Sequence, residues 1–266
     1  MELIKHCMVK PGSKVKLDER DADDTFGIHR DDDAMTGKLD KLSELQRLLY
    51  ADHKHALLIV LQALDAGGKD GTVRHVMSGV NPQGCEVTSF KAPSSEELAH
   101  DFLWRIHKAV PRLGNIGIFN RSQYEDVLIV RVHKLVPKSV WSERYHQINA
   151  FEHSLVENNV AILKFFLHIS KDEQKKRFEE RLTNPKKNWK LSAPDFEERK
   201  CWDDYIKAYE AVLRKCSTEW APWYVIPAND KWFRDFAILS IVVRTLEQMK
   251  LKYPAPAIDL SKVSFD

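Results

Sequence analysis

The chain is poor in cysteine and in long apolar runs. Its 266 residues include four cysteines, Cys7, Cys85, Cys201 and Cys216, and these form neither a CxxC pair nor a metal-binding spacing. Reduced thiols in a cytoplasmic protein are therefore expected. No apolar run approaches the roughly 18–20 residues that a membrane-spanning helix needs. The N-terminal residues lack the apolar core of a signal peptide, so neither a membrane protein nor an exported protein is predicted.

Charge of one sign is also lacking. The 41 Lys plus Arg nearly cancel the 39 Asp plus Glu, which leaves a formal net charge of +2. This balance argues against a protein-wide field that attracts nucleic acid, although it permits a local basic patch. The apolar fraction of 43% and the charged fraction of 30% are ordinary for a folded protein, which excludes wholesale disorder.

Short apolar segments alternate with helical patterns along the chain. Strands are predicted at residues 56–61, 86–90, 116–119, 160–169 and 223–226. Helices are predicted at about 39–49, 94–106, 122–133, 138–158, after Ser170, and at about 230–249. This alternation predicts an α/β fold, a three-layer sandwich with a mainly parallel five-stranded sheet. In such folds ligands bind at the carboxyl ends of the strands.

The chain divides into two parts of unequal size. Residues 1–36 are polar and dense in charge, and they are interpreted as an N-terminal extension that lies on the body. Residues 37–266 are interpreted as a single catalytic domain. Within it, residues 171–205 carry many basic side chains, and the helical pattern breaks at Asn184-Pro185. Two helices joined by a basic loop between two core strands predict a lid.

A glycine-rich turn follows the first strand. Its sequence, residues 65–72, is Asp-Ala-Gly-Gly-Lys-Asp-Gly-Thr, and Gly68-Lys69 matches the end of the phosphate-loop (Walker A) pattern G-x-x-x-x-G-K. Backbone N–H groups, the following helix N-terminus and Lys69 would bind phosphate oxygens. The match departs from the pattern at Ala63, which replaces the first glycine, and at Asp70, which replaces Ser or Thr. The alternative is an ordinary glycine-rich turn with a surface lysine.

The missing hydroxyl points to Asp65. Because the usual Mg²⁺-binding Ser or Thr is absent, Asp65 is the expected carboxylate ligand of Mg²⁺, with Mn²⁺ as a substitute. The alternative roles of Asp65 are a cap of the following helix or a general base.

A second group of polar residues follows the strand at 116–119. It reads Asn-Arg-Ser-Gln-Tyr-Glu-Asp over residues 120–126. The planar guanidinium of Arg121 is suited to brace a transferring phosphoryl group. The alternative is a salt bridge from Arg121 to Glu125 or Asp126.

Together these segments resemble the polyphosphate kinase 2 family. The resemblance rests on residues 64–72, 119–126 and 177–202, supported by 89–94 and 100–105, and covers about residues 40–252. It implies a Mg²⁺-dependent, reversible phosphotransferase that moves a phosphoryl group from inorganic polyphosphate to AMP or ADP. Asn120 and Glu125 resemble the subclass that phosphorylates both nucleotides. The partners expected are polyphosphate and adenine, or alternatively guanine, nucleotides, together with further copies of the chain in a dimer or tetramer.

The resemblance and the residues assign three groups of site residues. The catalytic residues are Asp65, Lys69 and Arg121. The phosphate-binding residues are Ala66, Gly67, Gly68, Asp70, Gly71 and Thr72 in the turn and Arg177, Arg181, Lys187 and Lys190 in the lid. The nucleotide-binding residues are Lys91, Arg105, Asn120 and Glu125. The alternative for the basic lid residues is a solvated helix face.

Two other functions compete with this one. An ATP-dependent nucleoside monophosphate kinase would carry Gly-Lys-Ser or Gly-Lys-Thr, which this turn lacks. A non-catalytic anion- or RNA-binding protein would interleave aromatic with basic residues. Only Phe178 and Trp189 interrupt the basic segment 175–190, which disfavours RNA binding.

Overall fold

The computed structural model describes residues 2–265, and it confirms the α/β architecture. The five strands are β1 (Ala56–Ala63), β2 (Cys85–Ser89), β3 (Ile116–Asn120), β4 (Val160–His168) and β5 (Trp223–Pro227). The longer helices are α2 (Asp32–Asp52), α3 (Lys69–Val76), α7 (Lys138–Glu157), α8 (Lys171–Thr183), α9 (Ala193–Lys200), α10 (Trp202–Cys216) and α11 (Lys231–Gln248). The shorter helices are α1 (Glu2–Cys7), α4 (Ser95–Leu98), α5 (Trp104–Lys108), α6 (Ile129–Val132), η1 (Pro82–Gly84), η2 (Gln123–Val127), η3 (Asn188–Lys190) and η4 (Leu260–Lys262).

All five strands are parallel and form one sheet in the order β2-β3-β1-β4-β5. β1 lies in the middle, and every residue of it is buried. Leu61 of β1 pairs with Asn120 of β3 and with Phe165 of β4. This register brings the residues that follow β1 and β3 to the same edge of the sheet.

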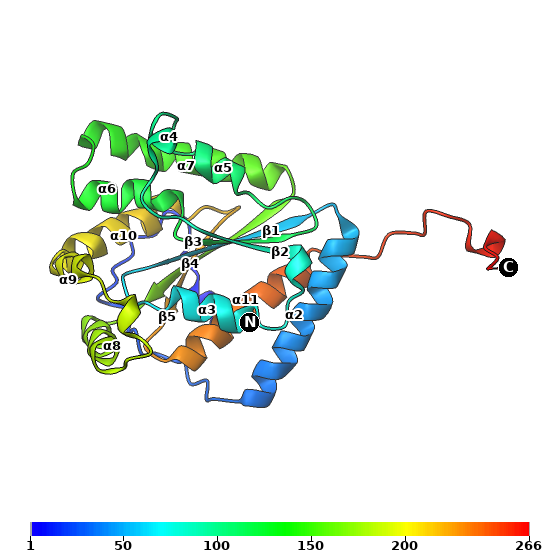
Figure 1. Ribbon diagram of the computed structural model, residues 1–266, viewed down its shortest axis with the longest axis horizontal. Coiled ribbons are helices and arrows are strands. Elements are labelled where there is room, and N and C mark those ends of the chain that lie inside the picture. Colours follow the sequence, from blue (N-terminus) through cyan, green and yellow to red (C-terminus); the bar gives the residue numbers. More distant parts are fainter. Residues whose placement is uncertain (1, 266) are drawn as a thin grey trace.

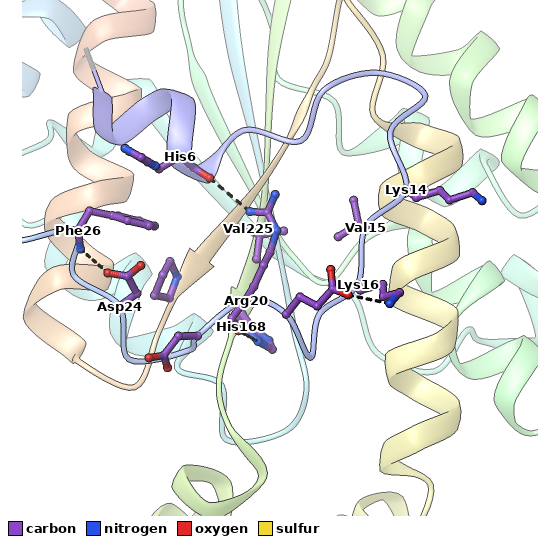
Figure 2. Close-up of a pocket in the computed structure, with 12 residues that line it drawn as sticks. His6, Lys14, Val15, Lys16, Arg20, Asp24, Phe26, His168 and Val225 are labelled. Atoms are coloured by element: carbon purple, nitrogen blue, oxygen red, sulfur yellow. Dashed lines mark hydrogen bonds and ion pairs between the residues drawn. The ribbon is translucent and has the colours of Figure 1, made fainter.

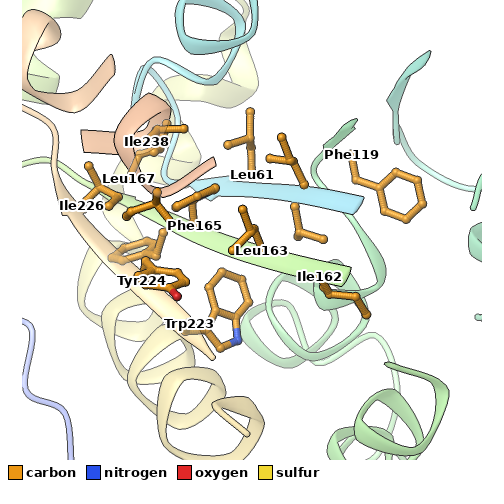
Figure 3. Packing of buried hydrophobic residues seen from close by; sticks show 14 of the residues in the cluster. Leu61, Phe119, Ile162, Leu163, Phe165, Leu167, Trp223, Tyr224, Ile226 and Ile238 are labelled. Carbon is orange, nitrogen blue, oxygen red and sulfur yellow. The ribbon is translucent and has the colours of Figure 1, made fainter. Parts of the chain in front are cut away.

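Helices cover both faces of the sheet (Figure 1). α2, α3 and α11 pack together on one face, while α7, α10 and α6 cover the other. Apolar side chains from the strands and from α11 fill the space between the layers, as Figure 3 shows for Leu61, Phe165, Trp223 and Ile238. No helix within residues 2–265 is both long enough and apolar enough to cross a membrane.

Residues 2–30 run along the β5 side of the body. Met8 forms an antiparallel bridge with Tyr224, and the Val9 amide donates to the Trp223 carbonyl at 2.8 Å. Arg20 and His168 border a pocket of about 390 Å³ between this segment and the ends of β4 and β5 (Figure 2). None of the predicted site residues lines that pocket. The division of the chain at residue 36 stays a prediction, and α2 begins before it, at Asp32, where the Asp31 side chain caps the helix.

Two helices predicted as continuous are interrupted. The helix predicted at 94–106 is split into α4 and α5, because the Asp101 side chain accepts from the Leu103 amide at 2.9 Å and holds a turn between them. Ser94 and Glu97 form a capping box at the start of α4. The helix predicted at 122–133 is split into η2 and α6, since the backbone of Leu128 (φ −103°, ψ −86°) lies outside the helical region.

The predicted lid region contains α8, η3 and α9. α8 ends where Asn184 turns extended (φ −100°, ψ 109°), one residue before Pro185. Its N-terminus follows β4 after two residues, with the Ser170 side chain accepting from the Glu173 amide. Figure 1 shows α8 and α9 side by side at the end of the sheet from which the β1–α3 turn emerges.

Candidate active site

The turn between β1 and α3 is shaped by its glycines. Gly68 has φ +102°, a conformation that residues with a β-carbon avoid, and the backbone of Ala66 is also left-handed (φ +60°). A β-carbon on Gly67 would collide with the Ala63 side chain and lie 2.8 Å from the Leu64 carbonyl oxygen. Gly68 caps α3 without a side chain, which leaves the first N–H groups of the helix for an anion. We call residues 65–71 the phosphate loop.

Lys69 lies at the start of α3 with its ammonium group inside the loop. Its Nζ donates to the carbonyl oxygen of Ala63 at 3.0 Å. Burial lowers the pKa of Lys69, and the nearby Arg121 lowers it further, against the opposing pull of the Asp65, Glu125 and Asp70 carboxylates. Within residues 2–265 its ammonium group makes this one hydrogen bond and no salt bridge.

Asp65 and Arg121 face each other across the edge of the sheet. Arg121 Nη2 donates to Asp65 Oδ1 at 3.1 Å. The backbone of Arg121 is left-handed (φ +64°), and its amide donates to the Leu61 carbonyl at 3.1 Å, which continues the β1–β3 pairing by one more residue. The salt bridge considered for Arg121 thus forms with Asp65, whereas Asp126 pairs with Arg144 at 2.8 Å.

The neighbouring polar residues tie β3 to the phosphate loop. Asn120 Nδ2 donates to Asp70 Oδ1 at 2.8 Å. Glu125 lies behind Arg121, and burial raises the pKa of its carboxyl group, against the opposing effect of Arg121 and Lys69. Two strand ends therefore present a group of charges that the chain only partly neutralises by itself.

A cavity of about 720 Å³ opens over the phosphate loop. Twelve of the predicted site residues line it: Asp65, Ala66, Gly67, Gly68, Lys69, Asp70, Gly71, Lys91, Asn120, Arg121, Arg181 and Lys190. Its wall is completed by Ser89, Phe90, Ala92, Trp189, Ser192 and Asp195. The phosphate loop, β3 and the lid region therefore meet at one cavity.

A second cavity of about 270 Å³ lies on the other side of the Asp65–Arg121 pair. Glu125 lines this second cavity and not the first, together with Tyr205 and Tyr209 of α10. Burial raises the pKa of both tyrosine hydroxyls, so they remain neutral donors at physiological pH.

Four other predicted residues lie outside the first cavity, at contacts of their own. The Thr72 hydroxyl donates to Asp235 at 3.2 Å, and Arg105 donates to the Lys91 carbonyl at 2.8 Å. Lys187 pairs with Glu180. The fourth, Arg177, is buried beneath the phosphate loop.

Arg177 holds the back of the loop. Its guanidinium donates to the Ala66 carbonyl at 2.9 Å, to the Ala228 carbonyl at 2.6 Å and to Glu173 at 2.7 Å. Next to it, Gln174 Nε2 donates to the Asp65 carbonyl at 2.9 Å. These contacts connect α8 directly to the loop. Direct phosphate binding by Arg177, Thr72, Arg105 and Lys187 stays a prediction.

Several residues in or next to the first cavity were not predicted from the sequence as site residues. Ser192 and Asp195 form a capping box at the start of α9, and the S-x-x-D spacing is the signal that could have indicated them. Trp189 is 77% exposed, and Lys190 lies over its ring at 5.1 Å. Arg234 of α11 is buried against the loop, and no local pattern marks it.

The residues at this site fit a hard cation. Mg²⁺ is usually held by one or two carboxylates together with phosphate oxygens and water. Asp65 supplies a carboxylate that lines both cavities. Within residues 2–265 no three His, Cys, Asp or Glu side chains gather as a preformed metal centre. A metal here would thus depend on the phosphates of a substrate for most of its ligands.

Comparison with known proteins identifies the family. The family model described as polyphosphate kinase 2 matches residues 29–254. The chain belongs to the polyphosphate kinase 2 family. An AMP/ADP-polyphosphate phosphotransferase of Meiothermus ruber is 51% identical over 98% of this chain and 99% of its own length. An ADP-polyphosphate phosphotransferase of Rhodopseudomonas palustris is 52% identical over 82% of this chain and 79% of its own.

A solved structure shows the same fold. The polyphosphate kinase 2 of Arthrobacter aurescens TC1 is 44% identical and superposes with a TM-score of 0.91, covering 95% of this chain and 92% of that one. The family match confirms the resemblance on residues 64–72, 119–126 and 177–202, because the region matched by the family model, residues 29–254, contains all three segments.

Proposed function

We propose that this protein is a polyphosphate-dependent nucleotide kinase, which transfers a phosphoryl group from inorganic polyphosphate to AMP or ADP. The observation that carries the proposal is the phosphate-loop cavity, where the one hydrogen-bond acceptor of Lys69 among the described residues is a backbone carbonyl and Arg121 stands beside it. The names of the relatives from Meiothermus ruber and Rhodopseudomonas palustris support the same activity.

The phosphate loop suits a substrate made only of phosphate groups. Backbone N–H groups at the start of α3 and the Lys69 ammonium recognise oxygen and charge without recognising a base or a sugar. Arg181 and Lys190, on the opposite wall of the cavity, extend the positive surface from the loop to the lid. A chain of phosphates can therefore run between the loop and the lid.

Transfer at this site requires little acid–base chemistry. The attacking group is a nucleotide phosphate, whose second pKa is about 6, so it is mostly ionised at neutral pH. Lys69 and Arg121 are placed to stabilise charge on the transferred phosphoryl group and on the leaving phosphate. Asp65 is not needed as a base, and its hydrogen bond to Arg121 orients the guanidinium.

Asp65 is also the residue that would hold a divalent cation, which we propose to be Mg²⁺. When bound, the cation supplies positive charge to the phosphate oxygens. The protein contributes the anchor, because Asp65 lies where the two cavities meet.

The nucleotide is assigned to the β2–β3 side of the cavity. Lys91 is exposed there, and the Asn120 amide lines the same cavity. Both are suited to the nucleotide's phosphates. Acceptance of guanine nucleotides, assembly into a homo-oligomer and a cytoplasmic location remain proposals from the sequence.

One assay tests this function. The purified chain with Mg²⁺ and polyphosphate is given AMP or ADP, and the formation of ADP and ATP is followed. Turnover that disappears in Lys69→Ala supports the proposal. Turnover with ATP as the only donor and none with polyphosphate would instead indicate an ordinary nucleotide kinase. Binding of polyphosphate or RNA without turnover would indicate a binding protein.

A further inference from the structure

A buried arginine of α11 lies directly behind the phosphate loop. Arg234 is 2% exposed, and its Nη1 occupies the place that a β-carbon on Gly68 would take. Its Nη2 lies 3.5 Å from the corresponding position on Gly71. The guanidinium therefore packs against the backbone of the turn that begins α3.

The orientation of this guanidinium is fixed by the next residue. Arg234 Nε donates to Asp235 Oδ1 at 2.8 Å, and Nη2 donates to Asp235 Oδ2 at 3.0 Å. Nη1, the nitrogen nearest to Gly68, donates to no acceptor in the described part of the chain. The Nε and Nη2 edge of the guanidinium is thus paired with Asp235, and Nη1 faces Gly68 in the loop.

The same carboxylate also grips α3. Thr72 donates its hydroxyl to Asp235 Oδ1 at 3.2 Å, and the His75 ring nitrogen Nδ1 lies 3.0 Å from Asp235 Oδ2. Because Thr72 and His75 both belong to the helix whose N-terminus forms the loop, Arg234 and Asp235 tie α11 to the phosphate-binding backbone at several points. Burial lowers the pKa of Arg234, and the Asp235 carboxylate opposes that effect. Burying the charged guanidinium of Arg234 costs free energy, which argues that the charge has a function at the loop.

We propose that Arg234 is a positioning residue of the phosphate loop: it holds the Gly68 turn in its anion-binding conformation and keeps a positive charge directly behind the bound phosphate. The role extends the proposed function, on which it rests. Arg234 acts through the loop and not by touching the nucleotide, so its effect should fall on polyphosphate.

The test compares Arg234→Gln with Arg234→Lys, and with Arg244→Gln on the exposed side of the same helix as a matched control. Arg234→Gln removes the charge but keeps a donor for Asp235. We expect it to raise the KM for polyphosphate about tenfold or more and to move the KM for nucleotide by less than about twofold. Arg234→Lys, which restores the charge, should bring the KM for polyphosphate back to within about threefold of the wild type. Arg244→Gln should change neither KM.

Three results would overturn the inference: equal effects of Arg234→Gln on both substrates, no effect on polyphosphate, or an Arg234→Lys variant no better than Arg234→Gln. If Arg234→Gln does not fold, as judged by thermal unfolding, Asp235→Asn takes its place. It keeps the side-chain shape but removes the anchoring charge, and an unchanged KM for polyphosphate would then reject the role.

Failure of the proposed function gives a different pattern. If the wild type shows no turnover, polyphosphate binding is measured by calorimetry on the wild type and Arg234→Gln. Weaker binding by the variant then supports the role of Arg234, and equal binding rejects it.

Discussion

Two lysines lie deep in this molecule, and the protein holds them differently. Lys164 in the middle of β4 is fully buried, and its Nζ donates to Glu152 at 2.5 Å and to the Cys216 carbonyl at 2.6 Å. It also donates to the Tyr124 hydroxyl at 3.0 Å. In the described part of the chain, Lys69 Nζ donates only to the Ala63 carbonyl.

From this difference in hydrogen-bond partners we interpret Lys164 as a structural charge and Lys69 as the phosphate-binding charge of the proposed function. Glu152 also accepts from Tyr124 at 2.7 Å and from Gln123 at 2.9 Å, so the Lys164 pair is part of a satisfied network in the core. Lys69 lies at a cavity with Arg121 as a neighbour, and we propose that its charge serves a phosphate ligand. The comparison predicts opposite outcomes when each lysine is removed.

The largest effect on activity is expected from Lys69→Met. Loss of the ammonium should lower kcat/KM for polyphosphate by at least about a hundredfold, or about 3 kcal/mol, as for the loss of one key transition-state donor. The stability of the ligand-free protein should be unchanged or higher, because burial disfavours the charged form of Lys69. Kinetics and thermal unfolding measure the two effects. A marked loss of stability would mean that Lys69 is a structural charge.

Lys164→Met should show the reverse. Removing one member of a buried ion pair leaves the Glu152 carboxylate uncompensated, which costs about 3–5 kcal/mol in the free energy of unfolding. Turnover per folded molecule should fall far less than in Lys69→Met. Denaturant titration measures the stability, and Lys207→Met, at a side chain 68% exposed, is the control that should cost almost nothing. An equally small cost for Lys164→Met would contradict the comparison.

The pH dependence of polyphosphate binding tests the comparison of Lys69 with Lys164 further. Since the pKa of Lys69 is lowered, its proton is lost at a lower pH than that of an ordinary lysine. Above that pKa the KM for polyphosphate should rise by up to about tenfold per pH unit. Over the same window, up to the ordinary lysine pKa, the unfolded state binds more protons, so this group makes stability rise with pH. The alkaline rise in KM should flatten in Lys69→Arg, and its persistence there would assign it to another group.

The smallest effect is expected within the lid. Arg181 lines the cavity, where its Nη1 lies 3.9 Å from Asp195 Oδ2, whereas Lys187 pairs with Glu180 and does not line it. Arg181→Gln should raise the KM for polyphosphate by about tenfold, which is the value of one charge-assisted hydrogen bond. Lys187→Gln should leave that KM almost unchanged. Steady-state kinetics compares the two variants, and equal effects would mean that the lid acts only as a diffuse positive surface.

Much of this arrangement was predictable from local sequence. The apolar run at 56–61 and the glycines after it predict a buried strand followed by a turn, and the structure has both at these residues. Parallel pairing of β1 with β3 then brings Asp65 and Arg121 together. This is expected because the carboxyl ends of parallel strands lie at the same edge of a sheet.

The rest depends on long-range contacts. Arg177 is predicted from the sequence to bind phosphate, and the local sequence does not reveal that its guanidinium also donates to the Ala66 carbonyl beneath the loop. Arg234 is more than 160 residues away in the sequence from the loop it contacts. Its neighbour Asp235, which accepts from Thr72, is equally distant in sequence. The interruptions at Asp101 and Leu128 also escaped detection, since a helical pattern does not report where a side chain captures the backbone.

The two borders of the sheet differ in their protection. Along β5, the bridge from Met8 and the Val9 amide occupy backbone groups that would otherwise be open, while β2 borders the sheet with Val87 half exposed. An open border is a template for pairing with another chain. The N-terminal segment therefore covers part of the β5 edge, and a chain shortened to start at Leu17 should expose a second unpaired strand edge while keeping its phosphate loop.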